Sequence, residues 1–171
     1  GDLVILSGAT GTGKSSFAAN VARDIGIIQK IPCLYINSEM SKDQMALRWT
    51  SLLSGVSHSA LREGAISEET LLSLPLSLDK LHGAAIETIT MPDLRIDNAI
   101  SEMRRFKAQK QIRVAILDYI RRCDFGDSKN REDWQVLTGA ARRLKTIAQE
   151  LGIVVIMLAQ LNASGRLAQA S

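Results

Sequence analysis

The residues with the clearest chemical purpose lie near the start of the chain, at positions 8–15. They follow the pattern G-x-x-x-x-G-K-S, whose glycines let backbone N–H groups surround a polyphosphate. We expect Lys14 to neutralise the outer phosphates and the Ser15 hydroxyl to bind Mg²⁺. The expected nucleotide contacts are Gly8, Ala9, Thr10, Gly11, Thr12, Gly13, Lys14, Ser15 and Ser16. The motif therefore predicts that the protein binds a nucleoside triphosphate.

Three further polar side chains follow apolar segments that we predict to be strands. Asp118 comes directly after the apolar segment Val114–Leu117. In many phosphate-loop proteins the carboxylate that holds Mg²⁺ also follows an apolar strand directly. Glu39 could orient water for attack on the γ-phosphate, although an acidic residue is also favourable at the start of the next helix. Gln160 could donate a hydrogen bond to the γ-phosphate or to that water. The site residues predicted for catalysis are thus Glu39, Lys14 and Gln160, and those for the metal are Ser15 and Asp118.

Hydrophobic patterning places these residues on alternating strands and helices. Buried strands are expected at 3–6, 33–37, 114–117 and 153–158, and an edge strand at 86–91. This alternation predicts an α/β fold with a mostly parallel sheet covered by helices on both faces. In such sheets ligands bind at the carboxyl ends of the strands, so the phosphate loop, Glu39, Asp118 and Gln160 should converge.

The helices are predicted from caps and glycine stops. We expect the first helix to begin at Lys14 and to end near Gly26, and the second to open with a capping box at Ser41 and Gln44. Residues 57–83 indicate one or two short helices with an interruption at Pro75. The remaining helices are expected at 97–110, with Asp97 as the cap, and at 132–150, with a loop at 121–131.

The composition is that of one globular domain spanning residues 1–171. Apolar residues make up 46% of the chain and charged residues 23%. No secretory signal is visible, and the longest apolar run is far too short for a bilayer, so we expect a cytoplasmic protein without membrane contact. The two cysteines, Cys33 and Cys123, lack metal-ligand spacing and are expected to be reduced. Because the chain opens on Gly1, we expect it to be part of a longer protein.

The net charge of +3 is unevenly distributed. Residues 1–100 hold 8 basic and 11 acidic side chains, and residues 101–171 hold 13 and 7, which gives −3 and +6. A basic second half is compatible with a polyanion surface, and equally with solvated helix faces.

Taken together, these motifs resemble the C-terminal motor domain of DnaB-like replicative helicases, a branch of the RecA-like ATPases. Gly1–Leu6 is similar to that family's entry strand, Ser38–Ser41 to its second motif, and Leu117–Tyr119 to its metal motif. Ala159–Asn162 is similar to its third motif, and Leu61–Gly64 to a stretch between them. The resemblance covers the whole chain, with the motifs in the family's order.

The resemblance implies ATP and Mg²⁺ as cofactors, with Glu39 activating water and Gln160 sensing the γ-phosphate. It implies a homo-oligomeric ring of six subunits, threaded by single-stranded DNA and served by a primase and a helicase loader. It also implies an N-terminal collar domain and C-terminal strands with an arginine finger, neither of which is present in residues 1–171. The candidates for DNA phosphate contacts are Arg121, Arg122, Lys129, Arg131 and Arg166.

Other functions remain open from the sequence. The two charges of Arg121 and Arg122 stand where the family has an uncharged polar and an apolar residue, which departs from the family's pattern. A RecA-like recombination ATPase of the RadA/Sms type would keep ATP hydrolysis and DNA binding without unwinding. A small-molecule kinase would need an arginine-rich lid, which the stretch between Gly55 and Gly83 lacks. A non-catalytic module that binds ATP to control assembly is the third alternative.

Overall fold

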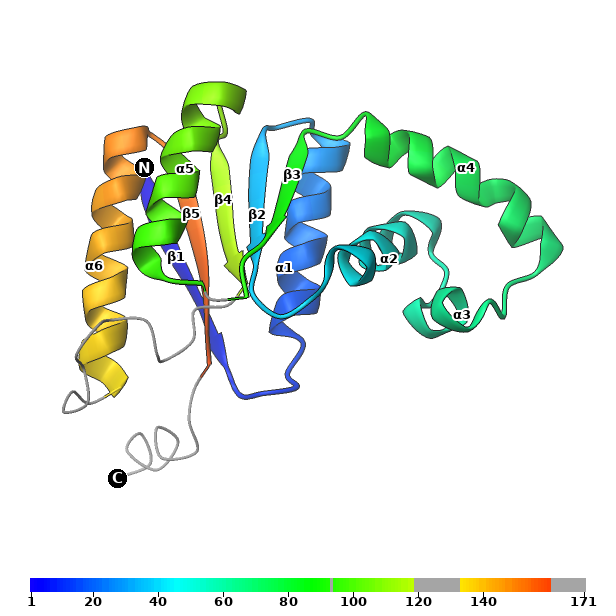
Figure 1. The fold of residues 1–171 in the computed structure, drawn as a ribbon, viewed down its shortest axis with the longest axis horizontal. Helices are drawn as coiled ribbons and strands as arrows, with labels where there is room; N and C mark the ends of the chain where they lie inside the picture. Colours follow the sequence, from blue (N-terminus) through cyan, green and yellow to red (C-terminus); the bar gives the residue numbers. More distant parts are fainter. Residues whose placement is uncertain (93, 119–132, 161–171) are drawn as a thin grey trace.

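A parallel sheet forms the centre of the protein in the computed structural model, which describes residues 1–92, 94–118 and 133–160 (Figure 1). The sheet has five strands in the order β1-β5-β4-β2-β3, and each of these pairings is parallel. The strands are Asp2–Gly8 (β1), Cys33–Asn37 (β2), Ile86–Thr90 (β3), Val114–Asp118 (β4) and Val154–Gln160 (β5). The predicted α/β fold with a parallel sheet is therefore confirmed.

Helices connect the strands and cover both faces of the sheet. They are Lys14–Ala22 (α1), Arg23–Ile28 (η1, a π-helical segment), Lys42–Ser54 (α2), His58–Glu63 (α3), Glu68–His82 (α4), Ile96–Lys110 (α5) and Asp133–Leu151 (α6). In Figure 1, α5 and α6 stand on one side of the strands and α1 on the other, while α3 and α4 extend beyond α2, away from the sheet. None of the helices in the described part of the chain is both long and apolar enough to span a bilayer.

Two hydrophobic cores lie on opposite faces of the sheet because side chains alternate along each strand. Leu34 and Ile36 of β2 pack into the core formed with α5 and α6. Cys33 and Tyr35 pack into the core formed with α1 and α2. Every residue of β2 and β4 is buried, which explains why both strands are apolar nearly throughout.

Several local predictions are confirmed. The predicted strand at 33–37 has the same bounds as β2, and the predicted edge strand is β3. At the start of α2, the Ser41 hydroxyl accepts the Gln44 N–H, and the Gln44 side chain accepts the Ser41 N–H at 2.8 Å. The helix ends at Gly55, whose φ of 73° lies in the left-handed region.

The prediction that the first helix ends near Gly26 is wrong. The chain continues helically through this residue, since α1 is followed directly by η1. Gly26 instead permits close packing against the start of β3. A Cβ atom at this position would lie 2.9 Å from the Cβ of Ile86, and the Gly26 carbonyl accepts the Ala85 N–H at 2.7 Å. The glycine is explained by a tertiary contact that local pattern does not reveal.

Two further predictions about helices are also wrong. Pro75 lies inside α4 and does not interrupt it. Proline removes the N–H that would bond the Leu71 carbonyl, but Leu71 is 56% exposed, so water can reach this side of the helix. In α5 the N-cap is Arg95 rather than Asp97, and Asp97 lies in the first turn, where its carboxylate pairs with Arg143 of α6.

The strand β1 is more exposed than predicted. It stands at the edge of the described sheet, with β5 as its neighbour. Val4 and Ile5 are 49% and 45% exposed, whereas an interior strand would bury both. The apolar composition of residues 3–6 therefore predicted a strand correctly. It also predicted that this strand is buried, and among the described residues it is not.

Candidate functional site

The loop between β1 and α1 has the backbone shape that its glycines predict. Gly11 and Gly13 have φ values of 77° and 84°, in the left-handed region that only glycine adopts readily. Gly13 is also the N-cap of α1, and no side chain caps the helix there. The first N–H groups of α1 are therefore oriented toward the loop, where the helix end favours an anion.

Lys14 is folded back across this loop. Its ammonium group donates to the carbonyl oxygens of Gly8 at 2.8 Å and Ala9 at 2.7 Å. The loop is braced further by Thr12, whose hydroxyl donates to the Ala9 carbonyl at 2.8 Å. A positive charge is thus held next to the loop backbone, where a polyphosphate requires one.

Ser15 and Asp118 meet although 103 residues separate them in the chain. The Ser15 hydroxyl donates to Oδ1 of Asp118 at 2.7 Å. Asp118 ends β4 and is only 4% exposed, and Ser15 lies in the first turn of α1. The backbone carbonyl of Asp118 accepts the Ser38 N–H at 2.8 Å, which ties the end of β4 to the end of β2. The Ser15 hydroxyl and the Asp118 carboxylate, which the sequence analysis took from two distant motifs, thus lie together.

These oxygens suit a hard cation such as Mg²⁺. Magnesium is usually bound by one or two protein groups, with phosphate oxygens and water completing its shell. Within the described ranges no group of three or more His, Cys, Asp or Glu side chains could hold a metal. The Ser15–Asp118 pair therefore fits a metal that arrives with a nucleotide.

Tyr35 is the residue of this cluster that the sequence analysis missed. Its hydroxyl donates to Oδ2 of Asp118 at 2.5 Å. Burial, and then the Asp118 charge, raise the pKa of Tyr35 far above its ordinary range, while the Arg48 guanidinium opposes this shift. The phenol therefore keeps its proton and remains a donor. The available signal was a tyrosine in an apolar strand, but the sequence alone does not show that β2 neighbours β4.

The turn after β2 positions Glu39. Asn37, which is 1% exposed, accepts the backbone N–H groups of Glu39 at 3.1 Å and Met40 at 2.9 Å through its side-chain oxygen. The Asn37 amide also donates to the Met40 carbonyl. This local bonding turns the chain sharply at the carboxyl edge of the sheet and leaves the Glu39 side chain exposed there.

Gln160 lies beside the phosphate loop. It pairs with Gly8 in the register of β5 with β1, and its side-chain amide donates to the Thr10 hydroxyl at 2.6 Å. Ser16 is exposed in the first turn of α1. Four neighbouring strands of the sheet, β1, β5, β4 and β2, end in these groups: the phosphate loop, Gln160, Asp118 and the turn with Glu39. The four strand ends therefore lie at one edge of the sheet, as predicted from the sequence.

The candidate DNA contacts lie outside the described residues. They are Arg121, Arg122, Lys129, Arg131 and Arg166. Cys123 and the predicted loop at 121–131 also fall outside them, whereas Cys33 is a buried free thiol.

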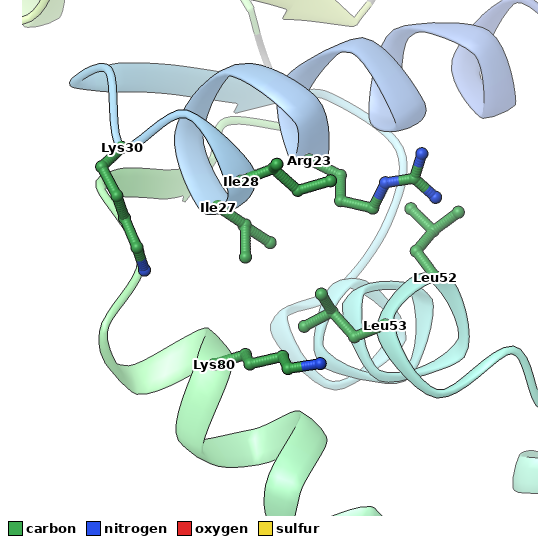
Figure 2. A pocket seen from close by; sticks show the side chains of 7 residues that line it. All are labelled: Arg23, Ile27, Ile28, Lys30, Leu52, Leu53 and Lys80. Atoms are coloured by element: carbon green, nitrogen blue, oxygen red, sulfur yellow. The ribbon is translucent and has the colours of Figure 1, made fainter.

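Two hollows lie beside α1. The larger has a volume of about 390 Å³ and lies at η1, beyond the end of α1 that is remote from the phosphate loop. Figure 2 shows Arg23, Lys30 and Lys80 around aliphatic side chains of η1 and α2 in this hollow. Arg23 pairs with Asp24 at 2.7 Å, and the Lys30 ammonium donates to the Gly83 carbonyl at 2.6 Å. Its position excludes it as the place for phosphates bound to the loop.

The smaller hollow, of about 220 Å³, lies next to the phosphate loop. Ser16 and Met40 line it, and these residues directly follow Ser15 and Glu39. Arg48 and His58 also line it, and within the described part of the chain Nη1 of Arg48 and Nε2 of His58 are enclosed without a hydrogen-bond partner. The side chains that carry these two nitrogen atoms thus line the same hollow as Met40, the residue after Glu39.

The fold and these residues define a class of protein: a phosphate-loop nucleotide-binding domain of RecA-like architecture. One solved ATPase domain has the same fold, with a TM-score of 0.84 at 19% identity over 95% of this chain and 58% of that one. A solved DnaB-like replicative helicase, described with its interactions with primase, gives 0.83 at 19% identity over 95% of this chain and 39% of that one. At this identity both likenesses concern the fold alone.

The chain belongs to the family of DnaB-like helicase C-terminal domains, whose model matches residues 1–168. It is 30% identical over 162 residues to a probable replicative DNA helicase of Trieres chinensis. That match covers 94% of this chain and 36% of the relative, so the chain spans about a third of the relative's length. The family resemblance predicted from the motifs is confirmed, and it is favoured over the recombination ATPase and the kinase.

Proposed function

We propose that the chain is the ATP-hydrolysing motor domain of a ring-shaped replicative DNA helicase, with residues 1–171 forming one RecA-like domain. The observation that supports this most is the contact of Ser15 with Asp118 at 2.7 Å beneath a complete phosphate loop. Family membership supports the coupling of this site to DNA unwinding. In this proposal the protein works in the cytoplasm as a hexamer around single-stranded DNA.

In this proposal, the phosphates of ATP bind to the backbone N–H groups of the loop. The Lys14 ammonium leaves the carbonyls of Gly8 and Ala9 and pairs with the outer phosphates, which exchanges two neutral acceptors for charged ones. Ser15 and Asp118 hold Mg²⁺, which when bound neutralises charge on the phosphate oxygens. These two residues fit such a cation because their hydroxyl and carboxylate oxygens already lie in contact.

Glu39 then takes a proton from the water whose oxygen bonds to the γ-phosphorus, while the bond between this phosphorus and the bridging oxygen breaks and ADP leaves. Glu39 follows β2, and β2 is the neighbour of β4, the strand that ends in Asp118. This position supports the role. Gln160 joins the loop to β5 through Thr10, so loss of the γ-phosphate can change the contacts at the end of β5. We assign Gln160 the role of sensor, which passes the state of the nucleotide to the segment that follows it.

The partners in this proposal follow from the family and from charge. Single-stranded DNA would run near Arg121, Arg122, Lys129, Arg131 and Arg166, which follow Asp118 and Gln160 in the chain. Primase is a partner by analogy with the solved DnaB-like helicase described with primase. A helicase loader is a further proposed partner, and an arginine from the neighbouring subunit would complete each ATP site.

The test is ATP turnover by the full-length protein, with and without a single-stranded oligonucleotide. We expect DNA to stimulate turnover, and a strand-displacement assay then to show unwinding. Turnover that is indifferent to DNA would overturn the motor proposal and favour an assembly ATPase.

Two substitutions test the assigned roles. Lys14→Ala should abolish tight ATP binding. Glu39→Gln should retain binding and slow turnover by about 100-fold or more, the usual contribution of a general base. Glu69→Gln, an exposed carboxyl group in α4, is the matched control and should behave like the parent protein. If Glu39→Gln hydrolyses ATP at the parent rate, the water-activating residue is another one.

A further inference from the structure

Tyr35 and Asp118 are brought together by the register of two neighbouring strands. Tyr35 of β2 lies opposite Ile116 of β4, and Asp118 is two residues further along β4. Residues two positions apart in a strand share a face, and such diagonal neighbours lie within reach of a long aromatic side chain. The Tyr35 hydroxyl uses this reach to donate to Oδ2 of Asp118 at 2.5 Å.

The two oxygens of the Asp118 carboxylate therefore have separate donors. Ser15 donates to Oδ1 at 2.7 Å, and Tyr35 donates to Oδ2. One hydrogen bond would leave the carboxylate free to rotate about its Cβ–Cγ bond, since this torsion is broad. Two bonds, one to each oxygen, restrict this rotation and with it the direction in which Oδ1 faces Ser15.

Tyr35 is itself held in place. It is fully buried, and its ring packs edge-on against Trp49 of α2, with 5.5 Å between centroids and 88° between planes. The Trp49 indole N–H donates to the Thr88 hydroxyl at 3.2 Å, and Thr88 lies opposite Tyr35 in β3. The phenol therefore occupies a position determined by β2, β3 and α2 before any ligand binds.

We infer that Tyr35 is a positioning residue, whose hydroxyl orients Asp118 for Mg²⁺ that binds with the nucleotide. This inference rests on the proposed function, in which Ser15 and Asp118 hold the metal. Groups that orient a metal-binding side chain commonly change metal affinity by about 10- to 100-fold when they are removed. Among the described residues, the Tyr35 hydroxyl donates to Asp118 and makes no hydrogen bond to the phosphate loop, so its contribution should concern the metal and not the affinity for metal-free nucleotide.

The test is Tyr35→Phe in the full-length protein, which removes the hydroxyl and keeps the ring against Trp49. Binding of a fluorescent ATP analogue is measured while Mg²⁺ is titrated, and again with EDTA present. We expect the Mg²⁺ concentration at half-saturation to rise about 10-fold or more, with metal-free binding unchanged. Thr146→Val is the matched control, because it removes a hydroxyl from α6, on the opposite face of the sheet, that donates only to the Arg142 carbonyl of its own helix at 3.1 Å, and its Mg²⁺ midpoint should equal that of the parent.

The outcomes separate this inference from the proposal beneath it. A parent-like Mg²⁺ midpoint in Tyr35→Phe overturns the role of Tyr35 and leaves the nucleotide site intact. An equal shift in Thr146→Val also overturns it, since loss of a hydroxyl that does not contact Asp118 would then have the same effect. Nucleotide binding by the parent protein that is independent of Mg²⁺ would instead refute the metal role of Ser15 and Asp118.

A second measurement covers the case in which Tyr35→Phe does not fold. Tyrosine labelled with ¹³C at Cζ, introduced at position 35 alone, reports on the hydrogen bond of the hydroxyl in the otherwise unaltered protein. Its resonance should move when Mg²⁺ is added to the nucleotide-bound protein, because Asp118 then shares its charge with the cation. A resonance that stays unchanged through this titration overturns the inference.

Discussion

Replacing Gly13 with alanine should separate the backbone geometry of the phosphate loop from its side-chain chemistry. Gly13 has a φ of 84° and forms the N-cap of α1, immediately before Lys14. A Cβ atom added at this position would meet nothing within 4 Å. The substitution therefore introduces no clash with a neighbouring residue, and its effect on the protein without nucleotide comes from the conformation of residue 13 itself.

The magnitude follows from the cost of the left-handed conformation. An L-residue with a Cβ atom is less stable there by about 1–2 kcal/mol, whereas glycine has no such penalty. If the loop of Gly13→Ala keeps its shape, the free energy of unfolding falls by that amount. If the loop relaxes, stability is preserved, but binding must restore the strained shape and ATP affinity falls by about 5- to 30-fold. The two losses should sum to about 1–2 kcal/mol.

Two assays measure these losses on the same samples. Urea unfolding followed by tryptophan fluorescence gives the free energy of unfolding, and the m-value should stay unchanged. Titration with a fluorescent ATP analogue gives the affinity. Gly55→Ala is the matched control, since Gly55 has a φ of 73°, also has nothing within 4 Å of an added Cβ atom, and ends α2 instead of the loop.

We expect Gly55→Ala to lose stability and to bind ATP like the parent protein, whereas Gly13→Ala should divide its loss between the two measurements. The reasoning is refuted if Gly13→Ala matches the parent in both assays. It is also refuted if both variants weaken ATP binding equally, because the loop would then have no special dependence on its backbone conformation.

The remaining predictions concern the two cores. Leu144 of α6 is fully buried, so Leu144→Ala should lower the free energy of unfolding by about 2–5 kcal/mol in urea, whereas Leu72→Ala, at a position 75% exposed, should change it by about 0.5 kcal/mol or less. A small loss at Leu144 would contradict the core described between the sheet and α6. Burial raises the pKa of the Cys33 thiol from 9.0 to about 12, so above pH 9 the unfolded chain loses a proton that the folded protein keeps, and stability falls as the pH rises. Between pH 8 and 10 this fall should be about 1 kcal/mol larger in the parent protein than in Cys33→Ala, as measured by urea unfolding, and equal falls would show that Cys33 is not buried as described.

The sequence was most informative where neighbouring residues decide the structure. The capping box of Ser41 and Gln44 and the glycine stop at Gly55 involve residues within one helical turn, and both occur as predicted. The apolar runs of β2 and β4 identified strands buried on both faces. Each of these features depends on backbone conformation or on periodicity, and a short stretch of sequence specifies both.

Two of the wrong predictions, those for Gly26 and Asp97, share a different cause. Gly26 was interpreted as a helix stop, but the structure uses it for close approach to Ile86, which is 60 positions away. Asp97 was interpreted as a cap, but it pairs with Arg143 of α6. In both cases a residue type with a common local role serves a contact between distant segments, and such contacts override weak local preferences.

In the candidate site, too, some features depend on consecutive residues and others on contacts between distant segments. By itself, the sequence determined the phosphate loop, because glycine tolerance of positive φ and the chemistry of Lys14 and Ser15 belong to eight consecutive residues. It also indicated which strand ends carry polar groups. Only the tertiary structure decided that Asp118 receives one hydrogen bond from Ser15 and another from Tyr35. That arrangement depends on β2 standing beside β4 in one register, and strand order arises from the packing of the whole domain rather than from any single segment.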